Sequence, residues 1–358
     1  MKKFDFSILR KVDVLNFDKT LVVKHKEKII KNFESKINIF CLLKSTFKCL
    51  YKLKIKNFIT NLKKEYFYNY CKKLNPKIVI GNEIDLQIFK FKKLFPEKIS
   101  IVFQLSLYKT EYKFLTKQRL DTFKTDYFLV YDQWHKKYFD FFNTKFLTVG
   151  SVKANYNIKQ NLKKKYDILF ISSYRPNSHI DPINYYYYSS KVCMVDTYLS
   201  YKKVADYCDL KSKKLAVALS SNRKEKIHKI NKEDEVKFFD GINKNYYTED
   251  ANCFNLANQS NLIIVTHSTL GVELLNMGHK VLFLNNFSNL GSLHLFEEKP
   301  STGKFWINND QLNGLNEKIT DLIEISNEEY ESLVKDENII KYYDKNNSQL
   351  INLINKHA

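Results

Sequence analysis

The sequence has few of the residues that usually break or bend a chain. Its 358 residues include 8 glycines, 5 prolines and 2 tryptophans. Lysine, asparagine, isoleucine, tyrosine and phenylalanine are abundant instead, as in chains encoded by AT-rich DNA. Hydrophobic residues make up 44% and aromatic residues 15%, which excludes a disordered chain. The sequence therefore predicts a folded globular protein, long enough for two domains.

The six cysteines form no CxxC pair and no framework-like spacing, which is typical of reduced, buried thiols. The N-terminal stretch MKKFDFSILRKVD lacks the apolar core of a secretory signal. No stretch approaches the roughly 18 to 20 apolar residues that a membrane-spanning helix requires. From these absences we expect a soluble, cytoplasmic protein.

Acidic residues are in deficit, with 39 against 59 lysines and arginines, so the net charge is +20. This charge either follows from the composition alone or marks an anionic partner, such as a membrane surface, an anionic substrate or nucleic acid. The lysines are spread along the whole length, and no RNA- or DNA-binding signature occurs. We therefore expect no nucleic-acid partner.

Short apolar runs alternate with helix-like segments, which predicts an α/β fold of two Rossmann-like domains with mainly parallel sheets facing across a cleft. We expect strands at 12–17, 37–43, 77–81, 100–104, 127–131, 146–150, 167–172, 214–220, 261–265 and 280–285. We expect helices at 57–73, 86–94, 132–142, 196–210, 250–258, 269–277 and 310–325.

The polar, basic segment NYNIKQNLKKK separates the two halves. It is interpreted as a linker, although a surface loop within one large sheet is the alternative. The predicted division is an N-terminal acceptor-side domain (1–155), a linker (156–165), a C-terminal ligand-binding domain (166–330) and a helical tail (331–358).

The stretch THSTLGVELLNMGHKVLFLN, residues 266–285, lies between the buried strand LIIV and the next strand, VLFL. A short helix stopped by Gly278 follows the polar cluster. The cluster therefore occupies the carboxyl end of a strand, where open α/β sheets bind ligands. Ser268 or Thr269 would cap the helix, and Gly271 would let backbone approach closely. Free amides there would form an anion site, unless the hydroxyls are ordinary caps.

Two further side chains of this stretch are candidates for ligand binding. Glu273 can accept hydrogen bonds from two adjacent hydroxyls, as a ribose presents them; the alternative is a solvent-facing helix residue. His267 lies in the loop where it can contact phosphate, and its alternative is a structural histidine.

The order strand, STLGxE, short helix, GxKV, strand resembles the donor-binding unit of GT-B-type glycosyltransferases. It most resembles bacterial surface-carbohydrate (capsule or lipopolysaccharide) biosynthesis proteins of that architecture. The resemblance covers most of residues 165–325, including DILFISSYR, KLAVALSSNRK and FWINN, and only KIVIGNEIDLQIF and SIVFQ in the first half. It implies that Ser268, Thr269 and Glu273 bind the phosphate and ribose of a nucleotide-sugar. The sequence departs from related sialyltransferase-like enzymes in lacking a His-Pro dipeptide and a glycine-rich loop.

Two arginines follow strands in this lysine-rich chain and are candidates to stabilise the leaving phosphate. Arg175 follows DILFISS, whose Ser172 we assign to the same nucleotide-sugar site, and Arg223 follows KLAVALSSN. Surface charge is the alternative. No DxD or HExxH string occurs, so we expect no metal and no cofactor besides the donor.

The acceptor hydroxyl requires a catalytic residue, and the string GNEID offers Glu83 and Asp85. Either is a candidate general base, or the nucleophile of a retaining mechanism. Asp85 has an alternative role as the cap of a helix beginning at Leu86. Gln104 and Glu111 are weaker candidates.

The segment Leu43–Lys64 spaces apolar residues and lysines as a basic amphipathic surface does, which suits an anionic inner-membrane surface. A helix packed on its own domain is the alternative. The leading hypothesis is a metal-independent glycosyltransferase that acts on a surface polysaccharide or lipid-linked acceptor. A CDP-glycerol-type polyol-phosphate transferase, a nucleotide-sugar epimerase, a non-catalytic scaffold and a nucleic-acid-binding protein are the alternatives.

Overall fold

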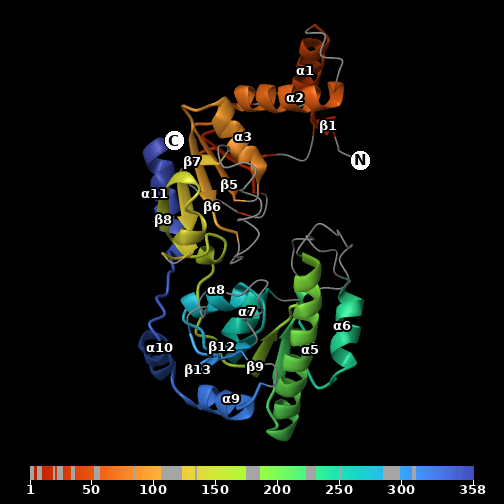
Figure 1. The fold of residues 1–358 in the computed structure, drawn as a ribbon, viewed down its shortest axis with the longest axis vertical. Helices are drawn as coiled ribbons and strands as arrows, with labels where there is room; N and C mark the ends of the chain where they lie inside the picture. The colour runs from red at the N-terminus through yellow and green to blue at the C-terminus, as the bar shows by residue number, and fades with distance from the viewer. Residues whose placement is uncertain are drawn as a thin grey trace. The chain divides into compact units, whose positions relative to one another are not determined.

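A computed structural model shows the chain as two compact units (Figure 1). The first lies within residues 1–105, 116–153 and 344–358, and the second contains residues 154–343. The residues that the structure describes are 4–5, 10–18, 21, 27–33, 37–51, 57–83, 85–105, 123–133, 135–174, 186–222, 231–249, 252–284, 299–308 and 312–358.

The first unit is built on six parallel strands in the order β3-β2-β5-β6-β7-β8. Their bounds are Val14–Asn16 (β2), Ile30–Asn32 (β3), Ile78–Asn82 (β5), Ile99–Phe103 (β6), Lys124–Val130 (β7) and Asn143–Thr148 (β8). All except β3 lie on predicted strands. The prediction missed β3 because this edge strand is short and not buried, so it carries no apolar run.

The strand predicted at 37–43 is wrong. Only Ile37–Asn38 (β4) is extended, paired with Phe4–Asp5 (β1), and Ile39–Tyr51 forms helix α1. The side chain of Asn38 accepts a hydrogen bond from the N–H of Cys41 at 3.2 Å, which is how a capping residue starts a helix. A short apolar run fits either state, and here the cap favours the helix.

Three further helices lie within the described residues of the first unit. Phe58–Leu74 (α2) and Leu86–Leu94 (α3) confirm the predicted segments, whereas the segment at 132–142 forms only a 3-10 turn at His135–Tyr138. The C-terminal helix Ser348–His357 (α11) also packs on this unit: the hydroxyl of Tyr127 in β7 lies 3.0 Å from Nε2 of His357.

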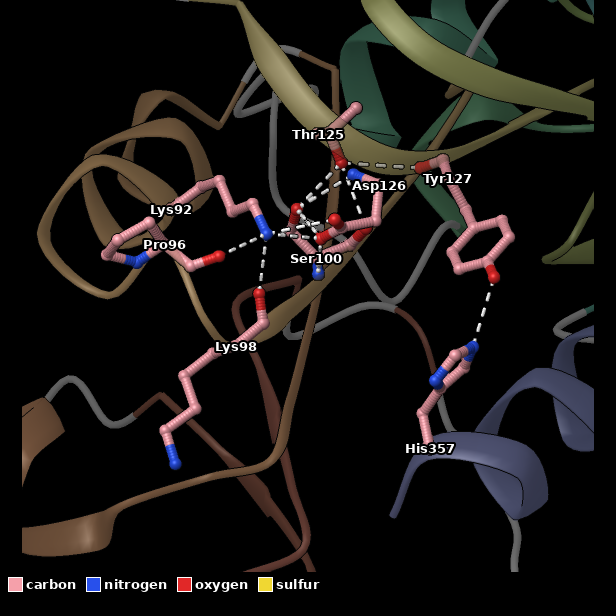
Figure 2. A network of polar contacts seen from close by, with 8 residues as sticks. All are labelled: Lys92, Pro96, Lys98, Ser100, Thr125, Asp126, Tyr127 and His357. Atoms are coloured by element: carbon pink, nitrogen blue, oxygen red, sulfur yellow. Dashed lines mark hydrogen bonds and ion pairs between the residues drawn. The ribbon is translucent and has the colours of Figure 1, made fainter.

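A buried lysine joins α3, β6 and β7 at the amino end of the first sheet (Figure 2). The Lys92 ammonium donates to the carbonyls of Pro96 and Lys98, both at 2.8 Å, and lies 2.7 Å from a carboxylate oxygen of Asp126. That oxygen also accepts from the N–H of Ser100 at 2.7 Å. The network therefore fixes the register of β6 and β7 at their amino ends, away from the carboxyl ends of the strands.

The second unit has a six-stranded sheet in the order β10-β9-β11-β12-β14-β13, antiparallel only at its last pair. The strands are Tyr166–Ile171 (β9), Leu215–Ala218 (β10), Ser260–Val265 (β11), Val281–Leu284 (β12), Thr302–Gly303 (β13) and Trp306–Ile307 (β14). The first four confirm the predicted strands. Because β13 and β14 have two residues each, neither shows a periodic pattern.

The described α-helices of the second unit are Tyr186–Leu210 (α5), Lys232–Asp240 (α6), Cys253–Asn258 (α7), Leu270–Asn276 (α8), Leu315–Glu324 (α9) and Asn327–Asp336 (α10) (Figure 1). Of these, α7, α8 and α9 lie on predicted helices, α5 begins earlier than expected, and α6 was not predicted. None of the helices in the described ranges combines the length and the apolar character needed to cross a bilayer.

Asparagine occupies half of the left-handed backbone positions among the described residues of this glycine-poor chain. Five of the seven described non-glycine residues with positive φ are asparagines, at positions 57, 75, 338, 346 and 347. Asn75, with φ 44°, ends α2, and its N–H donates to the carbonyl of Cys71 at 2.8 Å. Asparagine tolerates this conformation better than other residues with a side chain, so it replaces the usual glycine cap.

Lysines also bind the carbonyl ends of helices in the second unit. Lys164 donates to the carbonyl of Asn258, the last residue of α7, at 3.0 Å. Lys280 donates to the carbonyls of Ile323 and Ile325 at the end of α9. A cation there complements the negative end of the helix dipole. Part of the positive charge is therefore structural.

Both sheets have the same central topology. The chain runs from β2 to β3 on one side and then crosses to β5, and it runs from β9 to β10 and then crosses to β11. In each sheet, the order in which the chain adds its parallel strands therefore switches side between the first and the third strand. Open α/β sheets bind ligands at such a switch point. The predicted α/β class with two Rossmann-like, mainly parallel units is confirmed, and the cleft between them stays a prediction.

Candidate functional site

The loop Thr266–Thr269 follows β11 at the switch point of the second sheet. The hydroxyl of Thr266 donates to the hydroxyl of Ser173, which follows β9, at 3.0 Å, and both side chains are buried. This contact joins the two strands between which the sheet reverses. The polar cluster therefore lies where the sequence predicted it, at the carboxyl ends of parallel strands.

His267 is paired with a carboxylate from α5. Its Nε2 lies 2.6 Å from Oδ2 of Asp196, and the two side chains are 6% and 16% exposed. A carboxylate on one ring nitrogen fixes the orientation of an imidazole and leaves Nδ1 as the atom through which a ligand can be bound. Asp196 could not be predicted from the sequence, because it forms no local pattern with a loop that lies 71 positions further along the chain.

The two hydroxyls before α8 have different roles. The hydroxyl of Ser268 accepts a hydrogen bond from the N–H of Leu270 at 3.3 Å, so Ser268 acts as a cap. Thr269 is half-buried at the N-cap position, immediately before the helix, and its side chain makes no capping bond. Of the pair, Thr269 is therefore the better placed to bind a ligand.

The expectation that free amides of the first turn form an anion site is wrong for residues 270–273. Their four N–H groups donate to oxygens of Ser268 and Thr269 at 3.0–3.3 Å. A group that is already paired within its own turn does not bind an anion without breaking that bond. An anion would be held here by side chains of the preceding loop.

Gly271 lies against the sheet rather than against open space. A Cβ atom at this position would lie 2.5 Å from Cγ1 of Val265 and 2.9 Å from Cε1 of Phe283. The glycine does permit a close backbone approach, as expected, but α8 approaches strands β11 and β12. Glu273, two residues on, is half-buried on the same helix.

A fully buried glutamate that sequence analysis missed supports the loops after β9 and β10. The carboxylate of Glu235 in α6 accepts the hydroxyl of Ser172 at 2.5 Å and the N–H groups of Ser220 and Ser221, both at 2.8 Å. Ser172 is 1% exposed, so the structure gives its hydroxyl an internal partner. No local signal in KEDEV distinguishes Glu235 from its exposed neighbours.

The corresponding switch point of the first sheet also gathers polar side chains that the sequence analysis missed. Asp18, which follows β2, is 5% exposed. Its Oδ2 accepts a hydrogen bond from the side-chain amide of Asn82 at 3.1 Å and lies 3.5 Å from the ammonium of Lys153. Asn16, at the end of β2, donates to the carbonyl of Leu21 at 2.8 Å. The polar ending of the string VLNFD was the available signal.

The two predicted catalytic carboxylates lie beside this cluster. Both oxygens of Glu83 accept the N–H of Leu105, at 2.8 and 2.7 Å, and Glu83 is 3% exposed. Asp85 accepts the N–H of Gln87 at 2.9 Å, so its role as the cap of α3 is confirmed. Burial raises the pKa of Asp85 above its ordinary value, and the negative charge of Asp18 adds to this rise.

Of the remaining candidates, Gln104 has an internal partner, and the other three lie outside the described residues. The Gln104 side chain accepts the N–H of Tyr131 at 2.9 Å, which explains its burial. Glu111, Arg175 and Arg223 lie outside the described residues. Across the part of the chain that is described, no three His, Cys, Asp or Glu side chains gather as a metal site.

Solved structures share this fold at low sequence identity. UDP-GlcNAc 2-epimerase from Neisseria meningitidis, bound to UDP-GlcNAc, matches with a TM-score of 0.55, 12% identity, and coverage of 98% of this chain and 100% of that chain. The UDP-GlcNAc 2-epimerase from Methanocaldococcus jannaschii, in complex with UDP-GlcNAc and UDP, matches with a TM-score of 0.52 and 10% identity. This match covers 97% of this chain and 99% of that chain. A chain of the GtfA/B complex gives 0.46 and 14%; the match covers 82% of this chain and 60% of that chain.

A protein-family model describes most of the chain. The model matches residues 106–358, and its description is "putative O-antigen biosynthesis protein". No curated protein matches the sequence. The match includes the Thr266–Thr269 loop and confirms the resemblance to surface-carbohydrate biosynthesis proteins with a GT-B-type, Rossmann-like fold. The chain therefore belongs to this O-antigen biosynthesis family.

Proposed function

We propose that the chain is a glycosyltransferase that moves a sugar from a nucleotide-sugar to a saccharide or lipid-linked acceptor, without a metal ion. The observation that carries this proposal is the Thr266–Thr269 loop at the switch point of the second sheet, joined to Ser173 and Asp196. Its place at the carboxyl ends of β9 and β11 fits the general ligand position of open α/β sheets.

On the donor side, we assign ligand contacts to side chains of this loop and α8. The Thr269 hydroxyl and Nδ1 of His267 would bind phosphate, and Glu273 would accept the ribose hydroxyls. Arg175 and Arg223 would neutralise the leaving nucleotide, which replaces a metal in that role. Ser172, Ser268 and Gly271 would support the loop through their internal contacts.

On the acceptor side, Asp85 is the preferred general base. Its raised pKa brings it closer to the range in which a carboxylate removes a proton from a hydroxyl. Asp18 reinforces that shift. Glu83, with both oxygens on the N–H of Leu105, would position the β5 and β6 loops.

Epimerisation of a nucleotide-sugar is the second candidate. The fold similarity to UDP-GlcNAc 2-epimerases extends over 98% of the chain, and the Neisseria meningitidis protein was crystallised with UDP-GlcNAc. Both reactions require a site that binds the nucleotide of a nucleotide-sugar. They differ in whether the sugar is transferred to an acceptor or stays on the nucleotide.

Thermal melts with CMP-, CDP-, UDP- and GDP-sugars test the proposal first. One nucleotide at about a hundred times its Kd adds about 2.7 kcal/mol to the free energy of unfolding. We expect Thr269→Val and Glu273→Gln to reduce the shift, whereas Ser326→Ala, a cap on α10, leaves it unchanged. A chain that responds to none of these sugars refutes the assignment.

Product analysis then separates the two reactions. A nucleotide-sugar whose C2 configuration inverts without an acceptor identifies an epimerase. Release of free nucleotide that requires a saccharide or lipid-linked acceptor identifies a transferase, and Asp85→Asn should slow this release more than Glu317→Gln, an exposed control on α9.

A further inference from the structure

Helix α1 exposes its large apolar side chains and buries its small ones. The buried residues are Cys41, Ser45 and Cys49. The exposed residues are Phe40 (55%), Leu43 (49%), Phe47 (70%), Leu50 (53%) and Tyr51 (89%). A helix that packs only on its own domain usually has the opposite arrangement, with its bulky residues inside. The outward face of α1 therefore requires a separate explanation.

Specific contacts with α2 fix this orientation. The hydroxyl of Ser45 accepts a hydrogen bond from the side-chain amide of Asn69 at 2.9 Å, and both groups are buried. The ammonium of Lys48 lies 2.6 Å from a carboxylate oxygen of Glu65. Rotating α1 to bury its phenylalanines would break these contacts. The apolar face is therefore held outward by the fold.

The exposed residues form one continuous stripe. Positions 40, 43, 47 and 50 follow the spacing of three and four that places side chains on one side of a helix. Ile59, in the first turn of α2, is also 67% exposed. Within the first unit, α1 stands at the end of α2 farthest from α3 (Figure 1). The exposed stripe therefore lies at the end of α2 that is away from α3.

The charge around the stripe selects the partner. Residues 36–64 include eight lysines and no aspartate or glutamate. Lys44 is exposed on α1 beside the stripe, and Lys63 and Lys64 are exposed on α2. A second copy of the chain would bring like charges together, which opposes association. Anionic lipid headgroups attract each lysine, and the acyl layer beneath them accepts phenylalanine and leucine.

We infer that α1 is a membrane-docking helix that lies in the surface of an anionic bilayer. Phe40, Phe47 and Leu50 enter the boundary between headgroups and acyl chains, and the flanking lysines contact lipid phosphates. This inference does not depend on the reaction that the chain catalyses. It supplies a physical reason for an acceptor attached to lipid.

Vesicle flotation of the full-length chain tests the docking. The wild type should float with vesicles of phosphatidylglycerol and phosphatidylcholine and remain unbound with phosphatidylcholine alone. Phe40→Ser combined with Phe47→Ser should lower the partition coefficient at least tenfold. Leu210→Ser, which removes an apolar residue that is 72% exposed on α5, should leave it unchanged. Lys63→Gln with Lys64→Gln should weaken binding most at low salt.

The possible outcomes are distinct. Wild type that does not float, or a double phenylalanine variant that floats as well as wild type, overturns the inference. So does a wild-type dimer that the same variant converts to a monomer in light scattering, because the stripe would then be a self-contact. Circular dichroism checks that the variants fold, and nucleotide-induced melting shifts should be the same in all of them.

Discussion

Gly271 in α8 and Val265 at the end of β11 are so close that a Cβ atom on the glycine would lie 2.5 Å from Cγ1 of the valine. Val265 immediately precedes the Thr266–Thr269 loop, and Gly271 follows it. This contact therefore brings the two ends of the loop together and sets its curvature. In a chain with 8 glycines, this is a position where no other residue fits without movement.

Gly271→Ala should lower the free energy of unfolding by about 1–3 kcal/mol, the usual cost of an added methyl group in a packed core. Denaturant melts measure the loss. Gly81→Ala is the control, because its new Cβ would lie 3.4 Å from Cβ of Phe17, an ordinary contact. Val265→Ala should recover part of the stability of Gly271→Ala, and equal losses in the two glycine variants would contradict the packing role.

Glu235→Gln should destabilise the second unit by about 2 kcal/mol, because a buried carboxylate that accepts three hydrogen bonds becomes an amide with one acceptor oxygen. The loops that begin at Ser172 and Ser220 should loosen, so any nucleotide should also bind less tightly. Glu233→Gln, exposed on the same helix, is the matched control. Calorimetry with hydrogen exchange at Ser220 and Ser221 follows both effects, and unchanged protection there would refute the role.

Lys92→Met should cost about 3 kcal/mol, because it leaves the carboxylate of Asp126 and two carbonyls without their buried cation (Figure 2). Since this network lies at the amino end of the sheet, nucleotide binding should not change. Lys93→Met, exposed one residue later, should be nearly neutral. Urea melts of both variants provide the comparison, and a neutral Lys92→Met would show that the network contributes little.

The stability of the second unit should depend on pH through His279. Burial lowers the pKa of His279 to about 3 from 6.5, and the positive Lys159 and Lys164 add to the effect. Between these values the unfolded chain binds a proton that the folded chain does not. The free energy of unfolding should therefore fall as pH falls from about 6.5, by up to about 1.4 kcal/mol per pH unit.

Melts of His279→Gln and wild type at about pH 7 and about pH 5 isolate this contribution from that of the carboxylates. The difference in free energy of unfolding between wild type and His279→Gln should be smaller at the lower pH. Only wild type has the imidazole whose protonation favours the unfolded chain. His357→Gln, at the end of α11, serves as a second histidine control. A difference that stays constant with pH would exclude His279 as its source.

Asn75→Ala should lower the free energy of unfolding by about 1 kcal/mol, because alanine is strained at φ 44°. Asn75→Gly should be neutral or slightly stabilising, since glycine adopts this conformation without strain. Thermal melts of the two variants form an internal comparison. If alanine and glycine behave alike, the left-handed conformation is not the reason for the asparagine.

Sequence patterns identified the features that depend on neighbours along the chain. The apolar runs located β5, β6, β9 and β11, because strands buried in a parallel sheet need continuous apolar residues. The cap at Asp85 and the position of the Thr266–Thr269 loop followed from the same local rules. These predictions required no knowledge of which strands are neighbours.

Contacts between distant residues could not be predicted in this way. Asp196 meets His267 from another helix, and Glu235 meets Ser172 only because α6 packs beneath two loops. The segment 37–43 was misassigned because its apolar run fits both a strand and a helix with an outward apolar face. Tertiary packing decides each of these cases, and a single sequence does not show that packing.

The position of α11 has a consequence for how the chain is made. Asn347 donates to the carbonyl of Val152 at 2.7 Å, and His357 reaches Tyr127, so the first unit includes residues from both ends of the sequence. On the ribosome, the second unit is synthesised in full before the last helix of the first unit emerges. The nascent first unit must therefore wait, with the α11 side of its sheet uncovered, until residues 348–357 have also been translated. A stop codon near position 345 would remove α11 and would therefore destabilise the first unit more than the second.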